Sequence, residues 1–420
     1  MRTAPNPRVP WAFYGGPQVM DRLMDLAPLY LKKREEKRLR NGHPWLFSNE
    51  VDVGRSPLKS YAPGQPVQIR THGEEIIGCG YINPKSLICV RVLSRDPEAV
   101  IDAEFIGQRV RQAVASREQI YDAPFYRAIY GEGDGLPGVV VDRYGDLLVM
   151  QVGTAGMDQL TDQLIDALRA ELKPSAILLR NDASARELEG LPQYVEAAIG
   201  KVPDTVEVPE HGARFLTSPA QGQKTGWYFD HRANRAQLLQ WSSGGRVLDL
   251  FSYIGAWGVQ AAVAGATDVT CVDSGESAIL GVQTNAELTG VADKVNTIRG
   301  DAMQVVKELR RDGEQYDVVV VDPPAFIKRR KDTQSGTEAY RRLNGVAMQL
   351  VADGGLLVSA SCSYHFGRDK HLETLARVAR GNRSQASIIW EGGQGPDHPR
   401  HPALPESAYL STFFCRINRH

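Results

Sequence analysis

The stretch Val318-Val319-Val320-Val321-Asp322-Pro323-Pro324-Ala325-Phe326 decides the fold of this chain. Its four valines predict a buried strand, and the apolar run that ends at Cys362, forty residues after Asp322, predicts a second one. Parallel strands deliver the residues that follow them to the carboxyl edge of an open sheet, where doubly wound folds bind ligands. We therefore expect the carboxylate of Asp322 and the thiol of Cys362 to meet at that edge. The alternative is that Cys362 is a small core residue, since free cysteines are usually buried and inert.

The same pattern continues on both sides of this stretch. Strands that alternate with helical segments are typical of βαβ units, so the sequence predicts an α/β fold class with a Rossmann-like parallel sheet in residues 206–420. Two further apolar segments, residues 386–390 and 409–417, are expected to pair as an edge hairpin. The predicted parallel strands are Arg246–Phe251, Val269–Asp273, Asn296–Arg299, Tyr316–Asp322 and Leu356–Ser361.

The chain before residue 206 divides into three segments of different pattern. Residues 1–28 contain many prolines and glycines, which predict a flexible extension. Short β-type runs separated by turn residues favour a small β-barrel or sandwich in residues 29–100. Helical and strand patterns are mixed in residues 101–205, which predicts a central α/β domain. Its glycine-rich stretch 131–138 precedes a strand rather than a helix, so we interpret it as a turn and not as a phosphate loop.

The composition is that of a folded chain with balanced charge. The 420 residues suit two or three domains, and 49 basic against 50 acidic residues leave a formal charge of -1. A balanced total does not indicate a nucleic-acid binder, but it can conceal separated patches of either sign. The five cysteines stand singly, without the spacing of a zinc site or a disulfide framework, so no metal is expected. No apolar run reaches membrane-spanning length and no export signal is found, which predicts a cytoplasmic protein without a membrane partner.

Three predicted strand ends are expected to form one nucleoside pocket. Gly255 lies in a turn after the first strand, where a ligand can approach the backbone, and Asp273 ends the second strand at a spacing that suits a ribose diol. Asp301 ends the third strand, where its carboxylate can accept a hydrogen bond from an adenine amino group. Each aspartate alone would more often cap a helix, but the ordered series, without a full G-x-G-x-x-G fingerprint, favours S-adenosylmethionine. The predicted cofactor-binding residues at these ends and at the Asp322 loop are Phe251, Ser252, Tyr253, Gly255, Asp273, Ser274, Asp301, Ala302 and Asp322.

Several motifs of the chain resemble those of one family. Residues 222–232, 249–255, 322–326 and 361–363 resemble the bacterial 23S ribosomal RNA cytosine-5 methyltransferases that carry an N-terminal PUA domain, and residues 40–48 look like the PUA signature. The resemblance implies that the small β-barrel is a PUA RNA-binding domain and that the parallel sheet is a class I methyltransferase domain. It also implies that four further residues border the cofactor, namely Lys224, Tyr228, Asp230 and Arg232.

Two clusters of basic residues are candidate contacts for RNA phosphates. The N-terminal basic cluster has six positive and two negative side chains between residues 32 and 40, and a solvated helical face with internal ion pairs is an equal alternative. The loop basic cluster follows Asp322, where it can hold the backbone beside a base that has left its stack. The predicted RNA-binding residues are Lys32, Lys33, Arg34 and Arg38 in the first cluster and Lys328, Arg329, Arg330 and Lys331 in the second.

The chemistry that the resemblance implies uses both Cys362 and Asp322. Addition of the Cys362 thiolate to carbon 6 of a cytosine makes carbon 5 nucleophilic enough to accept a methyl group, and Asp322 is expected to hold the edge of the base. The expected partner is 23S ribosomal RNA or a large-subunit precursor, with a homodimer as one option for the assembly. Three alternatives stay open: a purine-nitrogen methyltransferase on the same scaffold, an RNA-binding or ribosome-assembly protein with a secondary catalytic domain, and a dinucleotide-dependent oxidoreductase.

Overall fold

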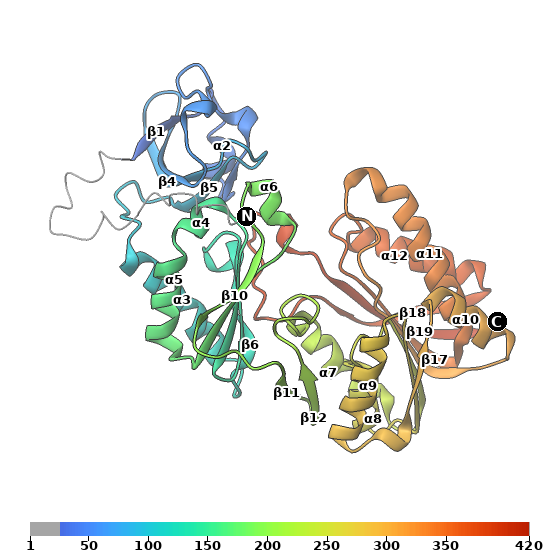
Figure 1. Ribbon diagram of the computed structural model, residues 1–420. Helices are drawn as coiled ribbons and strands as arrows, with labels where there is room; N and C mark the ends of the chain where they lie inside the picture. The colour runs from blue at the N-terminus through green and yellow to red at the C-terminus, as the bar shows by residue number, and fades with distance from the viewer. Residues whose placement is uncertain (1–25, 420) are drawn as a thin grey trace, which may run out of the picture. The chain divides into compact units, whose positions relative to one another are not determined.

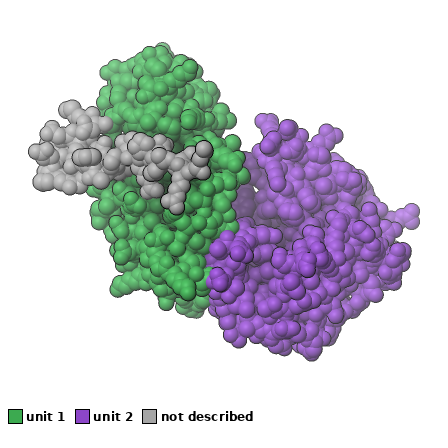
Figure 2. All heavy atoms as spheres, in the orientation of Figure 1, with its two compact units in different colours: residues 1–203, 396–407 green, residues 204–395, 408–420 purple. Residues whose placement is uncertain are grey.

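Two compact units make up the protein, whose computed structural model describes residues 26–419. The first unit consists of the chain up to Pro203 together with Pro396–Ser407, and the second of Asp204–Gly395 together with the chain from Ala408 onward (Figures 1 and 2). The extension predicted for residues 1–28 lies almost wholly outside the described residues. Within the described part of the chain, no helix has the length and apolarity that a membrane span requires.

A five-stranded sheet at the start of the first unit accounts for the predicted β-barrel or sandwich. Its elements are β1 Ala27–Tyr30, α2 Lys37–Arg40, β2 Trp45–Leu46, η2 Ser48–Glu50, η3 Leu58–Ser60, β3 Gln65–Arg70, β4 Ile76–Ile82 and β5 Val90–Ser94. The strand order is β1-β3-β4-β5-β2, with β1 parallel to β3 and the other pairs antiparallel. Val67 and Ile69, which alternate along β3, are fully buried with Leu29 and Val90, as expected for the core side of a strand.

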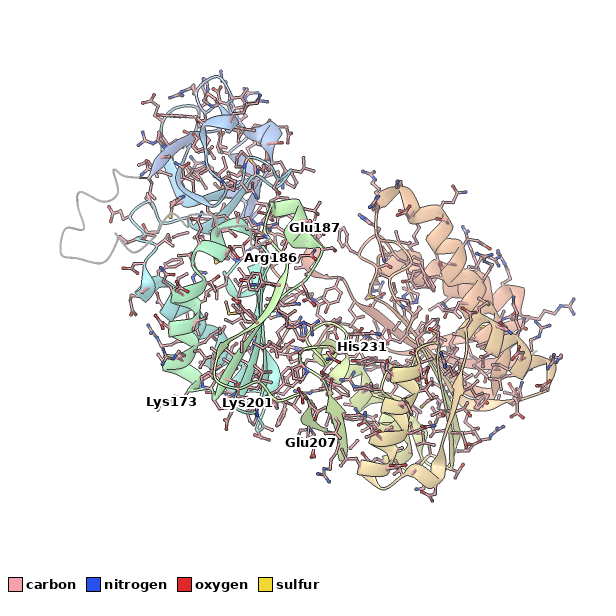
Figure 3. The ribbon with its side chains drawn as sticks, viewed as in Figure 1. Lys173, Arg186, Glu187, Lys201, Glu207 and His231 are labelled. Atoms are coloured by element: carbon pink, nitrogen blue, oxygen red, sulfur yellow. The ribbon has the colours of Figure 1, made fainter. Side chains whose placement is uncertain are left out.

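A second five-stranded sheet follows in the same unit. Its elements are α3 Ala103–Glu118, β6 Phe125–Tyr130, η4 Gly131–Asp134, β7 Val139–Tyr144, β8 Leu147–Val152, α4 Ala155–Gln159, α5 Thr161–Leu172, β9 Ala176–Asn181, α6 Ala185–Glu189 and β10 Tyr194–Ile199. The order is β10-β9-β8-β7-β6, with a parallel pair only between β8 and β9. The buried side chain of Arg186, which Figure 3 labels, forms an ion pair with Asp158 at 3.0 Å, and this pair ties α6 to α4.

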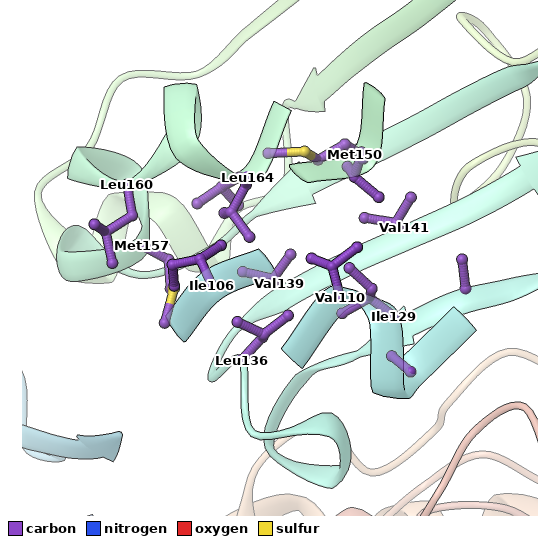
Figure 4. Packing of buried hydrophobic residues seen from close by; sticks show 14 of the residues in the cluster. Ile106, Val110, Ile129, Leu136, Val139, Val141, Met150, Met157, Leu160 and Leu164 are labelled. Carbon is purple, nitrogen blue, oxygen red and sulfur yellow. The ribbon is translucent and has the colours of Figure 1, made fainter. Parts of the chain in front are cut away.

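Hydrophobic packing holds the helices of this region on its sheet. Ile106 and Val110 of α3 and Leu164 of α5 lie in one buried cluster with Val139 and Met150 of the strands (Figure 4). The two α3 residues are four positions apart, so they lie on the same helical face. Burial of each such side chain stabilises the fold by about 1.5–3 kcal/mol, so this cluster anchors α3 and α5.

Residues 396–407 belong to the first unit although they lie late in the chain. The Oδ2 atom of Asp397 accepts a hydrogen bond from the backbone N–H of Arg127 at 3.0 Å, and the Asp397 carbonyl accepts one from Arg117 at 2.9 Å. This segment was predicted to belong with the rest of residues 206–420, because local patterns carry no sign of such distant contacts. The structure therefore differs from the predicted division of the chain at this segment.

A seven-stranded sheet forms the second unit, preceded by the hairpin β11 Val206–Glu210 and β12 Ala213–Thr217. The strands of the large sheet are β13 Arg246–Leu250, β14 Asp268–Asp273, β15 Val295–Arg299, β16 Tyr316–Val321, β17 Val351–Ser361, β18 Ser384–Gly392 and β19 Ser411–Arg419. The helices are α7 Arg232–Ser242, α8 Gly258–Val263, α9 Glu276–Thr289, α10 Ala302–Arg311, α11 Thr333–Leu350 and α12 Arg368–Gly381. The 3-10 turns of this unit are η5 Phe229–His231, η6 Ala292–Lys294 and η7 Arg330–Asp332. A further 3-10 turn, η8 Pro405–Ser407, belongs to the first unit.

The strand order of the large sheet is β15-β14-β13-β16-β17-β19-β18. The strands run parallel from β15 to β17, and β19 is antiparallel to both of its neighbours. All five predicted parallel strands are present, and the predicted edge hairpin is β18 with β19. The α/β fold class with a Rossmann-like sheet is confirmed.

The stretch quoted first owes its pattern to burial on two faces. Val319 and Val321 of β16 lie in the core cluster formed with α10, α11 and α12. Val318 and Val320 point to the opposite face, because side chains alternate along a strand. All four valines are at most 1% exposed, which explains why the strand shows as an unbroken apolar run.

Candidate active site

A cavity of about 350 Å³ lies at the carboxyl ends of β13, β14, β16 and β17. Asp322 and Cys362 both line it, because β16 and β17 are adjacent parallel strands whose register pairs Val321 with Ser359. This edge is where open α/β sheets bind their ligands. Nine of the predicted cofactor-binding residues line the same cavity: Lys224, Tyr228, Asp230, Phe251, Ser252, Tyr253, Asp273, Ser274 and Asp322.

Two side chains hold the carboxylate of Asp322. The indole N–H of Trp257 donates a hydrogen bond to Oδ2 at 3.1 Å, and Nε2 of His231 lies 3.4 Å from Oδ1. Burial acts to raise the pKa of Asp322, but His231 and Trp257 together outweigh it, so the pKa lies below its usual range. Asp322 is therefore an ionised, oriented acceptor at neutral pH.

Cys362 differs from the other cysteines in its access to solvent. It is partly exposed, whereas Cys79, Cys89, Cys271 and Cys415 are buried. Burial and then the charge of Asp322 raise the pKa of the Cys362 thiol to about 11, although the charge of Lys224 acts in the opposite direction. The side chain is therefore a thiol at neutral pH, and a nucleophilic role would require the transfer of its proton to another group.

The hydroxyl of Tyr340, a fully buried residue of α11, joins the loops that carry Asp322 and Cys362. It accepts a hydrogen bond from Ser361 Oγ at 3.0 Å and shares a second with Ser363 Oγ at 2.8 Å. Ser363 Oγ also accepts the backbone N–H of Ile327 at 3.2 Å. Both neighbours of Cys362 are thus tied to one tyrosine and, through it, to the chain that follows Asp322.

Asp273 closes the end of β14 with two backbone hydrogen bonds. Its Oδ2 accepts the N–H of Tyr253 at 3.0 Å, and its Oδ1 accepts the N–H of Gly275 at 2.9 Å. Each carboxylate oxygen has a second lone pair for a ligand hydroxyl. Nearby, the buried hydroxyl oxygen of Ser252 has no hydrogen-bond partner among residues 26–419. The donor and acceptor set therefore suits the sugar of a nucleoside.

The backbone around the cavity is strained at three residues. Phe251, Tyr253 and Lys224 have φ angles of 64°, 48° and 51°, in the left-handed region that costs a non-glycine residue about 1–2 kcal/mol. All three line the cavity. Strain of this kind is concentrated at functional sites, so the turn after β13 is a candidate ligand loop on geometric grounds.

A charged network borders the cavity on the side of residues 224–230. Nζ of Lys224 lies 2.6 Å from Oδ2 of Asp230, which also accepts a hydrogen bond from the hydroxyl of Tyr409 at 2.6 Å. The ammonium group lies 4.1 Å from the ring centre of Tyr228. Burial, followed by the charges of Asp322 and Asp230, raises the pKa of Tyr228, which keeps its hydroxyl protonated.

Four predicted cofactor-binding residues do not line this cavity: Arg232, Gly255, Asp301 and Ala302. The carboxylate of Asp301 is exposed and caps α10 by accepting the N–H of Gln304 at 3.0 Å. Arg232 lies 3.3 Å from the buried carboxylate of Glu210. Gly255 has a φ of 88° and lies within the strained turn.

Eight lining residues were absent from the predicted set: Gln223, His231, Arg235, Ala256, Trp257, Pro323, Pro324 and Ala325. The most informative are His231 and Trp257, because they hold Asp322. Neither residue was among the predicted site residues. His231 lies within the motif 222–232 and Trp257 follows the motif 249–255, but their meeting at Asp322 is a tertiary contact that no local pattern records.

The two basic clusters differ in how far their charges are already engaged. In the N-terminal basic cluster, Lys32 donates to a backbone carbonyl and Arg38 lies 3.3 Å from Glu50, while Lys33 and Arg34 are exposed. All four residues of the loop basic cluster are exposed. The loop basic cluster therefore has more exposed charge, and it follows the cavity residue Asp322 closely in the sequence.

Comparisons with known proteins agree with this geometry. Residues 29–95 match the model of a PUA-like domain family, and residues 192–388 match that of an S-adenosylmethionine-dependent methyltransferase family. Proteins named ribosomal RNA large subunit methyltransferase I from Serratia proteamaculans and Cronobacter sakazakii are each 34% identical to this chain, with 93% of this chain and 99% of the relative covered. A solved structure of a candidate SAM-dependent methyltransferase from Streptococcus mutans has a TM-score of 0.77 at 19% identity, covering 93% of this chain and 100% of its own. Another candidate methyltransferase, complexed with SAH, has a TM-score of 0.79 at 20% identity with the same coverage, and both structures show the shared fold.

The fold and the site first define the class of the protein. It combines a PUA-like domain with a methyltransferase domain that depends on S-adenosylmethionine. Similarity along nearly the whole chain then defines the family, and the chain belongs to the ribosomal RNA large subunit methyltransferase I family. The resemblance found in the sequence is confirmed.

Proposed function

We propose that this protein methylates carbon 5 of a cytosine in 23S ribosomal RNA or a large-subunit precursor. The observation that carries the proposal is that the accessible thiol of Cys362 shares one cavity with the ionised carboxylate of Asp322. The names of the relatives support ribosomal RNA as the substrate. We also propose that residues 29–100 bind RNA, that residues 101–205 form a central domain, and that the second unit carries out the transfer, in the cytoplasm where such RNA is found.

The residues of the cavity fit S-adenosylmethionine. When bound, this cofactor supplies an electrophilic methyl group. We assign the ribose hydroxyls to Asp273, whose oxygens keep acceptor capacity, and a further polar contact to the unpartnered hydroxyl of Ser252. We assign the adenine end to Asp301, because Phe251 lines both this cavity and an adjoining groove that Asp301 also lines.

The covalent step begins with Cys362. Its Sγ atom forms a bond to carbon 6 as the S–H bond breaks, and the electrons of the C5=C6 double bond make carbon 5 nucleophilic. The released proton passes through Asp322 to N3 of the ring, which becomes basic as sulfur adds. Since the pKa of Asp322 lies below its usual range, the carboxylate passes the proton on rather than keeping it.

The enzyme is restored by the reverse movement of the sulfur. Once carbon 5 carries the methyl group, its proton leaves to a base and the C5=C6 double bond forms again. The Sγ–C6 bond breaks, and N3 returns its proton through Asp322 to the sulfur of Cys362. Tyr340 holds Ser361 and Ser363, the two neighbours of Cys362, in place. This keeps the sulfur close to carbon 6 both when the bond forms and when it breaks.

RNA that contains 5-fluorocytosine tests this proposal directly. Fluorine cannot leave carbon 5 as a proton does, so the wild-type protein is expected to stay covalently attached to the RNA on a denaturing gel when S-adenosylmethionine is present. Cys362→Ala is expected to form no adduct and no 5-methylcytosine, while Cys79→Ala, which removes a buried thiol of the first unit, behaves as wild type. Formation of 5-methylcytosine by purified Cys362→Ala protein would exclude the mechanism.

The rival function is methylation of a purine nitrogen. The motif Asp322-Pro323-Pro324-Ala325-Phe326 supports it, because D-P-P-[YF] motifs also occur in enzymes that methylate exocyclic amino groups. Such chemistry requires no thiol, so Cys362→Ala would retain activity. Nucleoside analysis of RNA treated with labelled cofactor separates the two products.

A further inference from the structure

A second cavity, of about 610 Å³, lies within the first unit. Its walls come from the end of β5, from α3, from η4 and from the late segment 396–407. The volume is in the range of sites that take a small molecule or one nucleotide. It belongs to a different unit from the cavity of Cys362, so it is a separate site.

The carboxylates of this cavity are already matched by arginines. Oε1 of Glu132 accepts hydrogen bonds from Arg91 at 2.5 Å and from the indole of Trp45 at 2.7 Å. Both oxygens of Asp134 accept from the buried guanidinium of Arg117, at 2.6 and 2.7 Å. Neither carboxylate is left to neutralise another cation.

Two further arginines of the cavity, Arg95 and Arg109, differ from Arg91 and Arg117 in their partners. Neither forms an ion pair with any carboxylate of residues 26–419, and burial alone lowers the pKa of each. Arg95 donates to the carbonyls of Leu39 and Gly42, and Arg109 donates to the carbonyl of Leu93 at 3.1 Å. A guanidinium has five N–H donors and stays charged, so most of its donors remain for a ligand.

Gly135, directly after η4, lies against the guanidinium group of Arg109 at the cavity wall. Gly135 has a φ of 69°, and a Cβ atom at this position would lie 1.9 Å from Nη1 of Arg109. The left-handed φ favours glycine at this position, and a larger residue would displace the guanidinium group. His401 adds no positive charge at neutral pH, because burial, together with the charge of Arg95, lowers its pKa. The positive charge of the cavity therefore comes from two positioned guanidinium groups.

We infer that this cavity binds one phosphodiester group of the RNA substrate through Arg95 and Arg109. The non-bridging oxygens of a phosphodiester match the two forks of donors, which is the geometry that guanidinium groups recognise. Arg95 is exposed, so a continuous chain has access to it. It is also the last residue that matches the PUA-like family, while Arg109 lies on α3. The inference rests on the proposed function, because it takes RNA as the substrate.

The test is the salt dependence of RNA binding by the double variant R95Q/R109Q. Binding of an unmodified large-subunit rRNA transcript to full-length protein is measured by filter retention between about 50 and 200 mM KCl. We expect about tenfold weaker binding at low salt and a slope of log K against log salt that is smaller by about 1. The single variant R109Q, which disturbs fewer backbone contacts, is expected to show part of the same loss, and thermal unfolding verifies that both variants are folded.

Arg111→Gln is the matched control, because Arg111 lies on the same helix, is exposed and pairs with Glu104 outside the cavity. It is expected to keep the wild-type slope. Equal slopes for wild type and folded R95Q/R109Q would overturn the inference and leave the proposed function intact, whereas failure of wild type to bind the transcript would overturn both. Inorganic phosphate is also tested alone, by its effect on the melting temperature. If phosphate raises the melting temperature of the wild type but not of R95Q/R109Q, and the salt slope of RNA binding is the same for both proteins, the cavity binds a free anion and the RNA assignment is overturned.

Discussion

Asp249 of β13 and Asp322 after β16 lie on neighbouring strands of one sheet, yet their surroundings move their pKa values in opposite directions. Burial raises the pKa of Asp249 to about 8, and the charges of Asp322 and Asp273 add to this shift. Oδ2 of Asp249 accepts one hydrogen bond, from the N–H of Gly258 at 2.9 Å, and Oδ1 has no partner among residues 26–419. Asp322 is also enclosed, but Trp257 supplies a donor and His231 a second polar neighbour.

The comparison shows that partners rather than position set the charge of a strand-end carboxylate. Desolvation acts on both aspartates and favours the neutral form of each. The outcome reverses at Asp322, where His231 and the indole N–H of Trp257 face the two oxygens, whereas the single backbone N–H at Asp249 does not outweigh burial. The protein thus keeps a neutral acid at Asp249 and an ionised acid at Asp322, which lines the same cavity as the thiol of Cys362.

The largest effect is expected from removing the charge of Asp322. Asp322→Asn keeps the shape of the side chain but removes the proton relay of the proposed mechanism, so we expect kcat to fall by about 10³-fold. Asp249→Asn is the matched control on the neighbouring strand, and it is expected to stay within about threefold of wild type because the neutral amide resembles the protonated acid. Methyl transfer to rRNA from labelled cofactor measures both, and equal losses in the two variants would remove the distinction between the aspartates.

The neutral state of Asp249 predicts a pH dependence of stability. The pKa is about 8 in the folded protein against 3.8 for the ordinary group, so folding favours the protonated form. The contribution is complete below about pH 4 and is lost as the pH rises towards 8, at up to about 1.4 kcal/mol per pH unit. Asp249→Asn is expected to flatten this fall in the free energy of unfolding, measured in urea at several pH values. The same slope in variant and wild type would show that Asp249 is ionised in the folded state.

The donors to Asp322 are expected to act through its pKa. Trp257→Phe removes the indole N–H, and a hydrogen bond to a charged group is worth about 1.5–3 kcal/mol. The pKa of Asp322 should rise, so the acid limb of the pH profile of kcat should move to higher pH while activity falls about tenfold or more at neutral pH. Trp241→Phe, a change at an exposed tryptophan outside the cavity, is the control. A loss of activity without a shift of the acid limb would mean that Trp257 acts only by packing.

The smallest effect is expected at Tyr340, which positions the two loops without lining the cavity. Tyr340→Phe removes a hydroxyl that holds Ser361 and Ser363, at a cost of about 1 kcal/mol, so kcat should fall about fivefold. KM for the cofactor should not change, because the Asp273 side of the cavity is untouched. A rise in that KM with an unchanged kcat would assign Tyr340 to the general stability of the fold.

Much of the fold was predictable because burial leaves a direct trace in the sequence. A strand buried on two faces needs apolar residues throughout, as Val318–Val321 has, and all five parallel strands were found in this way. The meeting of Asp322 and Cys362 in one cavity followed from the same argument, since parallel strands end at one edge. The segment 396–407 was predicted to belong with residues 206–420, whereas it lies in the first unit. Its hydrogen bonds with Arg117 and Arg127 span more than half of the sequence, so no local pattern could indicate them.

The sequence by itself determined the α/β class, the ends of the strands and which reactive side chains stand at them, because these follow from periodicity and local order along the chain. Only the tertiary structure decided that Trp257 and His231 face Asp322, that Tyr340 ties the residues on either side of Cys362, and that Arg95 and Arg109 form no ion pair with a carboxylate of the described residues 26–419. These features are contacts between distant segments, and they set pKa values and unmatched charge through local desolvation and hydrogen bonding. A linear pattern records the type of a residue, whereas its protonation state depends on the neighbours that folding brings to it.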